Sequence, residues 1–171
     1  MTFPATLLER ASQVRLFVSD IDGVWTDGRI TVHADGTEST TFSVQDGLGV
    51  VRLLRAGLEI AVISGRKNPA VEHRARRLGI EEIHLGSLDK GPLIRSMMEA
   101  RGLKQEQVAT IGDDLPDLSM FCEAGLNFAP PSSVSEVRKR ADWITRASAG
   151  HGALREACNL LLEARSNVTT S

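Results

Sequence analysis

Short apolar runs rich in Val and Ile alternate with longer segments of helical periodicity along nearly the whole chain. The apolar runs predict strands at residues 14–19, 59–63, 82–85, 108–111, 126–129 and 143–145. Between the strands, and after the last one, the pattern predicts helices at 47–57, 69–78, 90–101, 115–124, 133–140 and 152–165. Strands that alternate with helices are typical of a parallel sheet covered on both faces. We therefore expect an α/β fold, a Rossmann-like three-layer sandwich with a mostly parallel central sheet.

One stretch departs from this rhythm. Arg29–His33 and Thr37–Val44 alternate with period two on either side of an Ala34-Asp35-Gly36 turn, which predicts a β-hairpin inserted after the first strand. The chain has no internal repeat or interdomain linker, and Ser166–Ser171 has the composition of a loose polar tail. We expect one domain over residues 1–171, with a hairpin flap at about 28–45, a C-terminal tail at about 147–171 and no cap domain.

Composition narrows the class of partner. Hydrophobic residues make up 42% and charged residues 25% of 171 residues, the balance of a soluble globular protein. A formal net charge of -2 disfavours nucleic acid and anionic lipid as partners. Cys122 and Cys158 form neither a disulfide framework nor a CxxC pair. The chain shows neither a basic leader nor a membrane-length apolar run, so we expect a cytoplasmic location and no membrane partner.

Acidic residues follow two of the predicted strands. The first strand leads into Asp20-Ile21-Asp22-Gly23, and the strand at 108–111 leads into Gly112-Asp113-Asp114-Leu115-Pro116-Asp117. The carboxyl edge of an open α/β sheet is where ligands bind, and clustered carboxylates there are tolerated when a cation relieves their repulsion. If the two strands are neighbours, the clusters converge on a site for a hard divalent ion such as Mg²⁺.

Two further strand ends supply groups that suit phosphate. Ser64, in Ile63-Ser64-Gly65-Arg66, offers a hydroxyl and adjacent backbone N–H groups at a turn. Lys90, in Leu88-Asp89-Lys90-Gly91, lies at a helix start and is able to neutralise phosphate charge or to hold an acidic nucleophile. Taken one by one, Ser64 and Lys90 also fit a helix cap and a surface charge.

The ordered set of Asp20-Ile-Asp-Gly-Val, Ser64, Lys90 and Gly112-Asp-Asp-Leu-Pro-Asp resembles the four motifs of the haloacid dehalogenase superfamily of phosphotransferases. The resemblance covers roughly residues 12–165. Within that superfamily the chain is most similar to the capless family of 3-deoxy-D-manno-octulosonate 8-phosphate (KDO 8-phosphate) phosphatases, through DIDGVWTDGRI, QDGLGV, ISGRKNPAVEHRARRLGI, LDKG, GDDLPDL and GHGALREAC. This resemblance implies that the protein releases phosphate from a small phosphorylated sugar acid in lipopolysaccharide precursor synthesis.

The resemblance also implies roles for individual residues. Asp20 would attack phosphorus to give an aspartyl-phosphate, and Asp22 would act as general acid and then general base. Ser64 would bind a phosphoryl oxygen and Lys90 would orient Asp20. Mg²⁺ would be held by Asp20, by the backbone carbonyl of Asp22 and by Asp113, with Asp117 behind them.

The segments between Asp22 and Ser64 and between Ser64 and Lys90 are too short to hold a cap domain. The capless relatives are tetramers in which hairpins associate and a C-terminal segment reaches an adjacent active site, so the resemblance implies a homotetramer. Gly150–Glu156 matches that segment in position. Substrate-binding candidates follow. They are Arg66 and Lys67 for the carboxylate, Asp46 for sugar hydroxyls, and Arg155 at the mouth of the site; surface charge or helix capping explains the four equally well.

Four other hypotheses remain open at this point. A receiver domain also combines an aspartyl-phosphate with Ser or Thr and Lys, although its motif order differs. A dinucleotide-binding domain is disfavoured because Gly47-Leu48-Gly49 does not continue into a complete GxGxxG. A non-catalytic phosphatase-like oligomerisation module would have no need of the full acidic set. A phosphatase for a nine-carbon, sialic-type ulosonate 9-phosphate is the nearest enzymatic alternative.

Overall fold

The computed structural model describes residues 3–169, with the side chains of 167–169 excepted. Six strands form one sheet in the order β5-β4-β1-β6-β7-β8, and every neighbouring pair is parallel. Their bounds are β1 Leu16–Ser19, β4 Glu59–Ser64, β5 Glu82–Leu85, β6 Val108–Ile111, β7 Leu126–Ala129 and β8 Trp143–Ile144. β1, one of the two central strands, is buried along its whole length.

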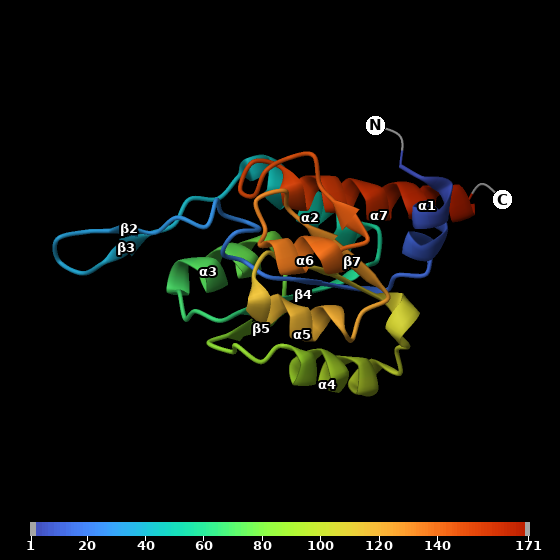
Figure 1. Cartoon of the computed structure of the whole chain (residues 1–171), viewed down its shortest axis with the longest axis horizontal. Coiled ribbons are helices and arrows are strands. Elements are labelled where there is room, and N and C mark those ends of the chain that lie inside the picture. The colour runs from blue at the N-terminus through green and yellow to red at the C-terminus, as the bar shows by residue number, and fades with distance from the viewer. Residues whose placement is uncertain (1–2, 170–171) are drawn as a thin grey trace.

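Helices cover both faces of this sheet, as Figure 1 shows. On one face lie α1 (Ala5–Ser12), α2 (Val44–Arg55), α3 (Pro69–Leu78) and α7 (Ala153–Thr169). On the other lie α4 (Gly91–Arg101), α5 (Leu118–Phe121) and α6 (Ser135–Arg140). Two 3₁₀ turns, η1 (Gln105–Gln107) and η2 (Leu115–Asp117), flank β6. The expected three-layer α/β sandwich is confirmed, and residues 3–169 contain no cap domain.

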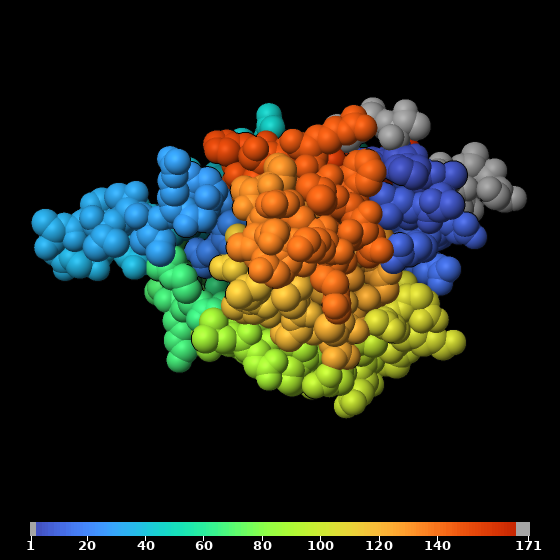
Figure 2. Space-filling model, in the orientation of Figure 1, coloured from blue at the N-terminus to red at the C-terminus, as the bar shows by residue number. Residues whose placement is uncertain are grey.

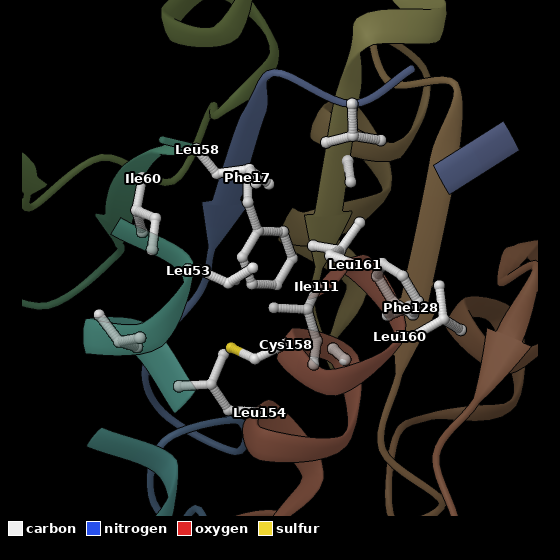
Figure 3. Packing of buried hydrophobic residues seen from close by; sticks show 14 of the residues in the cluster. Phe17, Leu53, Leu58, Ile60, Ile111, Phe128, Leu154, Cys158, Leu160 and Leu161 are labelled. Carbon is white, nitrogen blue, oxygen red and sulfur yellow. The ribbon is translucent and has the colours of Figure 1, made fainter. Parts of the chain in front are cut away.

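Alternation along the strands divides the apolar residues between two cores. Phe17 of β1 packs into the core beneath α2 and α7, whereas Leu16 and Val18 pack into the core beneath α4 and α5. Successive side chains of a strand point to opposite faces, so a strand that is apolar at every position is suited to the middle of a three-layer fold. Figure 3 shows part of the larger core, to which Phe17, Leu53, Phe128, Leu154 and Cys158 belong.

All six strands predicted for the parallel sheet form, and those at 82–85, 108–111 and 126–129 have the predicted bounds. The helix at 69–78 also has its predicted bounds, because Asn68 caps its first turn and Pro69 opens it. The helix predicted at 115–124 is shorter and divides into η2 and α5. Helix α1 was not predicted. None of the helices in residues 3–169 combines the length and apolar character needed to cross a bilayer.

The hairpin is narrower than its sequence pattern predicts. Only Thr31–Val32 (β2) and Glu38–Ser39 (β3) pair, and they form an antiparallel ladder apart from the main sheet. Both strands are exposed on both faces, so no core extends the pairing. Val44, predicted as the end of the second arm, starts α2 because the Ser43 hydroxyl caps that helix. Figures 1 and 2 show the hairpin projecting from the body.

The C-terminal segment is mainly helical. Helix α7 continues to Thr169, so the loose tail predicted from Ser166 is wrong as far as that residue, and residues 170–171 lie outside the described part. Asp46 of α2 fixes the start of α7. Its buried carboxylate accepts hydrogen bonds from the backbone N–H groups of Arg155 (2.7 Å) and Gly152 (3.2 Å). Burial raises the pKa of Asp46, and these hydrogen bonds oppose part of that rise.

Replacing Asp46 by Ala is expected to lower the free energy of unfolding by about 1–2 kcal/mol, because two N–H groups at the start of α7 lose their acceptor. Asp46→Asn retains one carbonyl oxygen and is expected to lose less. Urea unfolding followed by circular dichroism measures both variants. Equal stability of Asp46→Ala and the unaltered chain would contradict this role.

Candidate active site

The carboxyl ends of β1 and β6 lie side by side at one edge of the sheet. Ser19 lies opposite Ile111, and the backbone N–H of Asp20 donates to the Ile111 carbonyl at 3.0 Å. Asp20 therefore leaves β1 where residues 112–117 leave β6. Because this edge is where parallel α/β sheets bind ligands, the two predicted acidic segments share one candidate site.

A cavity of about 200 Å³ opens at this edge. It is lined by Asp20, Asp22, Gly65, Arg66, Leu88, Lys90, Asp113, Asp114, Pro116 and Asp117. Carboxylate oxygens of Asp20, Asp113 and Asp117 all lie within 4.8 Å of one another. Several hard oxygen donors at this spacing suit a divalent cation such as Mg²⁺.

Lys90 is the cation that the chain itself places among these carboxylates. It immediately precedes α4 and its side chain is 3% exposed. The Nζ atom donates to Oδ1 of Asp20 and, at 2.6 Å, to Oδ1 of Asp117. Burial alone would lower the pKa of Lys90, but the charges of Asp20 and Asp117 outweigh burial and raise it. Lys90 is therefore a fixed positive charge beside Asp20.

One ammonium group does not balance the acids around it. The pKa of Asp20 lies well above its usual range, first because of burial and then because of Asp117, although Lys90 opposes the rise. Burial, followed by the charges of Asp117 and Asp114, raises the pKa of Asp113 to about 7. A cation that binds here would replace a proton and relieve this repulsion.

Asp117 holds the loop that carries Asp113. Its Oδ2 accepts from the backbone N–H groups of Asp113 (2.7 Å) and Asp114 (3.1 Å), while its Oδ1 accepts from Lys90. A Cβ atom added at Gly112 would lie 2.5 Å from the Asp117 side chain, so position 112 has no room for any side chain larger than that of glycine. Since both Asp117 oxygens are engaged within the protein, Asp20 and Asp113 are better placed to offer oxygens to a cation.

Asp22 adds a carboxylate at the mouth of the cavity. Asp22 Oδ2 accepts from the Ser64 hydroxyl, and Oδ1 accepts from the Arg66 guanidinium, both at 3.3 Å. Ser64 also accepts from the backbone N–H of Arg66 at 3.1 Å. The end of β4 thus places Ser64 and Arg66 against the same acid. Residues of all four motifs therefore lie at one edge of the sheet: Asp20 and Asp22, Ser64, Lys90, and Asp113 with Asp117.

The other candidates lie elsewhere. Lys67 and Arg155 do not line this cavity; Lys67 packs over Gly86, and Arg155 donates to Asn159 (2.9 Å) and to the Gln45 carbonyl (3.2 Å). Asp46 is buried against α7, with its oxygens on backbone N–H groups. The geometry therefore does not support the sugar-binding role expected for Asp46, because a residue so buried has no oxygen to offer a sugar.

Three residues that shape the site were not predicted from the sequence. Gly23 has a φ of +85°, and a Cβ there would lie 2.0 Å from Asp113 Oδ2, so only Gly permits this approach. The Ser119 hydroxyl accepts from the backbone N–H groups of Lys90 and Gly91 at 3.2 Å. Glu38 of β3 pairs with Arg66. Only Gly23 carried a local signal, because it directly follows Asp22 in the acidic segment after the first strand.

A family model described as haloacid dehalogenase-like hydrolase matches residues 79–156. The 3-deoxy-D-manno-octulosonate 8-phosphate phosphatase of Yersinia pestis is 36% identical over 159 residues, which cover 93% of this chain and 85% of that protein. This chain belongs to the KDO 8-phosphate phosphatase family. The protein of the same name from Escherichia coli K12 is 37% identical over 161 residues, or 94% of this chain and 86% of that one.

Solved structures of this phosphatase family have the same fold as this chain over nearly its whole length. The Moraxella catarrhalis phosphatase, crystallised with a magnesium ion, a phosphate ion and a KDO molecule, has a TM-score of 0.93 at 38% identity and covers 98% of this chain and 97% of that one. The cobalt-bound Haemophilus influenzae phosphatase has a TM-score of 0.87 at 35% identity, with 92% of each chain covered.

The pKa of Asp113 sets a pH dependence for cation binding. Because this pKa is about 7 in the folded chain and 3.8 ordinarily, the cation-free protein loses stability as the pH rises through 7. Mg²⁺ is therefore expected to raise the melting temperature more at pH 8 than at pH 6. At about 100 times its Kd the cation adds about 2.7 kcal/mol, equivalent to about 5–10 °C.

Thermal scans with Mg²⁺ and with EDTA, taken at both pH values, give this difference directly. Asp113→Asn is expected to melt higher than the unaltered chain without the cation and to lose most of the Mg²⁺ effect. The same gain at pH 6 and pH 8 would contradict a link between proton loss from Asp113 and cation binding.

Proposed function

We propose that this chain is a Mg²⁺-dependent phosphomonoester hydrolase that releases inorganic phosphate from 3-deoxy-D-manno-octulosonate 8-phosphate. Membership of the family supports the reaction, and the Moraxella relative holds magnesium, phosphate and KDO together. The observation that carries the proposal is a buried carboxylate, Asp20, held by Lys90 beside Asp113 at the carboxyl edge of the sheet.

In the first step an Asp20 carboxylate oxygen attacks phosphorus, and the bond from phosphorus to the sugar oxygen breaks. Lys90 already holds Oδ1, which orients the carboxylate for attack through Oδ2. Asp22 gives its proton to the departing sugar oxygen, so the sugar leaves as an alcohol. The product on the enzyme is an aspartyl-phosphate.

In the second step a water molecule attacks the phosphorus of the aspartyl-phosphate. Asp22, now without its proton, takes one from this water, while the bond between phosphorus and the Asp20 oxygen breaks. Inorganic phosphate leaves, and both side chains return to their starting states. One residue serves both steps because the proton given in the first is regained in the second.

The other groups at this edge act on charge and position. When bound by Asp20, Asp113 and the backbone carbonyl of Asp22, Mg²⁺ supplies positive charge that offsets the carboxylates and the phosphoryl oxygens. The Ser64 hydroxyl, which donates to Asp22 at 3.3 Å in this structure, would donate to a phosphoryl oxygen when substrate is bound. Asp117 keeps Lys90 and the Asp113 backbone in place. Arg66, at the mouth, would bind the sugar-acid carboxylate.

The alternatives differ in what supports them. A receiver or dinucleotide-binding domain does not fit a chain of this phosphatase family. A non-catalytic module would not need the converging set of Asp20, Asp22, Ser64 and Lys90. A nine-carbon ulosonate 9-phosphate has the same reacting groups, and a panel of 8- and 9-phosphorylated sugar acids assayed for phosphate release distinguishes it. A cytoplasmic location stays a prediction from the sequence.

Asp20→Asn is expected to lower kcat by at least about 10³-fold, because an amide is a poor nucleophile. Asp22→Asn is expected to lower it by about 10²–10⁴-fold. EDTA should abolish phosphate release and Mg²⁺ should restore it. Thermal unfolding of each variant serves as the control for folding. Undiminished release by Asp20→Asn, or full release in EDTA, would refute the mechanism.

We also propose that the chain works as a homotetramer in which hairpins associate and a C-terminal segment, including Arg155, lies near a neighbouring site. The projecting hairpin supports this, since Val32 is 64% exposed and Ile30 is 48% exposed. Residues 3–169 also contain no cap domain that would cover the cavity, so a neighbouring subunit would have to cover it.

Val32→Asp is expected to break this association and to lower activity at least several-fold without changing the unfolding of the monomer, because Val32 has no core contact to lose. Val32→Thr, which keeps the shape without the charge, serves as the matched control. Sedimentation velocity and phosphate release are measured on the same samples. A fully active monomer would overturn the tetramer proposal.

A further inference from the structure

The Arg66 guanidinium is shared between two carboxylates from different parts of the chain. Its NH1 donates to Oδ1 of Asp22 at 3.3 Å, and its NH2 donates to Glu38 of the hairpin. Within residues 3–169, Glu38 is the hairpin acid that pairs with a residue of the cavity. The proposed mechanism gives Glu38 no role.

The hairpin is held in place where Glu38 meets Arg66. The Nδ2 atom of Asn68 donates to Oγ1 of Thr40 at 2.8 Å, two residues beyond Glu38. Asn68 is itself fixed, because its Oδ1 caps α3 through the backbone N–H of Ala70 at 2.9 Å. Glu38 therefore meets the guanidinium from a strand that is tied to the loop between β4 and α3.

In this arrangement Arg66 does not donate to Asp22 from both of its terminal nitrogens. Arginine binds a carboxylate most strongly as a fork, with two parallel N–H···O bonds that occupy both oxygens. Here the second nitrogen is turned to Glu38, and the single bond to Asp22 is at the long end of the hydrogen-bond range. The Ser64 contact to the other Asp22 oxygen is equally long. Asp22 is thus held weakly enough to turn to a substrate.

We propose that Glu38 is a positioning residue that draws the Arg66 guanidinium away from Asp22 and toward the hairpin. Without the Glu38 carboxylate, Arg66 closes on Asp22 as a fork and occupies the oxygens that must exchange a proton with sugar oxygen and water. The inference rests on the proposed function of Asp22. It also makes the placement of the hairpin a condition for turnover.

Glu38→Gln tests the inference on two substrates, KDO 8-phosphate and glucose 6-phosphate, which has no carboxylate. On glucose 6-phosphate, kcat is expected to fall about 10-fold, which is less than the about 10²–10⁴-fold contribution of a general acid and base. On KDO 8-phosphate the fall is expected to be smaller, because the substrate carboxylate competes with Asp22 for Arg66. The decisive variant is the double Glu38→Gln/Arg66→Gln. Its kcat is expected to match that of Arg66→Gln alone, because no guanidinium remains to close on Asp22.

Asp35→Asn is the matched control. It removes the same charge from the same hairpin, and Asp35 contacts Thr37 rather than the cavity. Its kcat should equal that of the unaltered chain. Unchanged kcat in Glu38→Gln, or an equal loss with and without Arg66, overturns the inference. If phosphate is released from glucose 6-phosphate but not from KDO 8-phosphate, only the proposed substrate is refuted, because the single and double variants still test Glu38 on glucose 6-phosphate. If phosphate is released from neither compound, the proposed function and the role of Glu38 are both refuted.

Discussion

One ammonium group among three carboxylates is the interaction on which this site depends. Removing charges from water costs several kcal/mol per ion in a protein interior, and a buried pair offsets that cost only when its geometry is good. Lys90 bonds to Asp20 and Asp117 but leaves Asp113 without a comparable partner. The remaining negative charge gives the site its affinity for a divalent cation and, through that cation, for phosphate.

The backbone around this cluster is shaped by close contacts. Gly23 and Gly112 each leave space that a carboxylate fills, Asp113 in one case and Asp117 in the other. The Ser119 hydroxyl joins the segment after β6 to the start of α4. Such contacts fix the acids relative to one another, so the electrostatic balance is a property of the loops as well as of the residue types.

The parallel sheet and the acids at its edge were predictable because each rests on a local pattern. Apolar runs such as 108–111 and 126–129 predict strands from local sequence alone, and Asp20 and Asp113 lie within two residues of the strands that precede them. The hairpin was predicted too long because period-two alternation does not reveal that both faces lie in solvent. Glu38 and Ser119 were missed because their partners lie 28 or more residues away in sequence, and only the fold joins them. The partner of Asp46 was not predictable, because the start of α7 lies more than a hundred residues away in sequence.

The order of elements along the chain bears on how the protein is made. Helix α7 packs against α1 and α2, and its Leu154, Cys158 and Leu161 fill the larger core beside Phe17. During synthesis the ribosome therefore releases the sheet and its first helices before the element that covers them exists. Until residues 153–164 emerge, that apolar face stays open to solvent and to chaperones, and the nascent chain cannot complete its native packing.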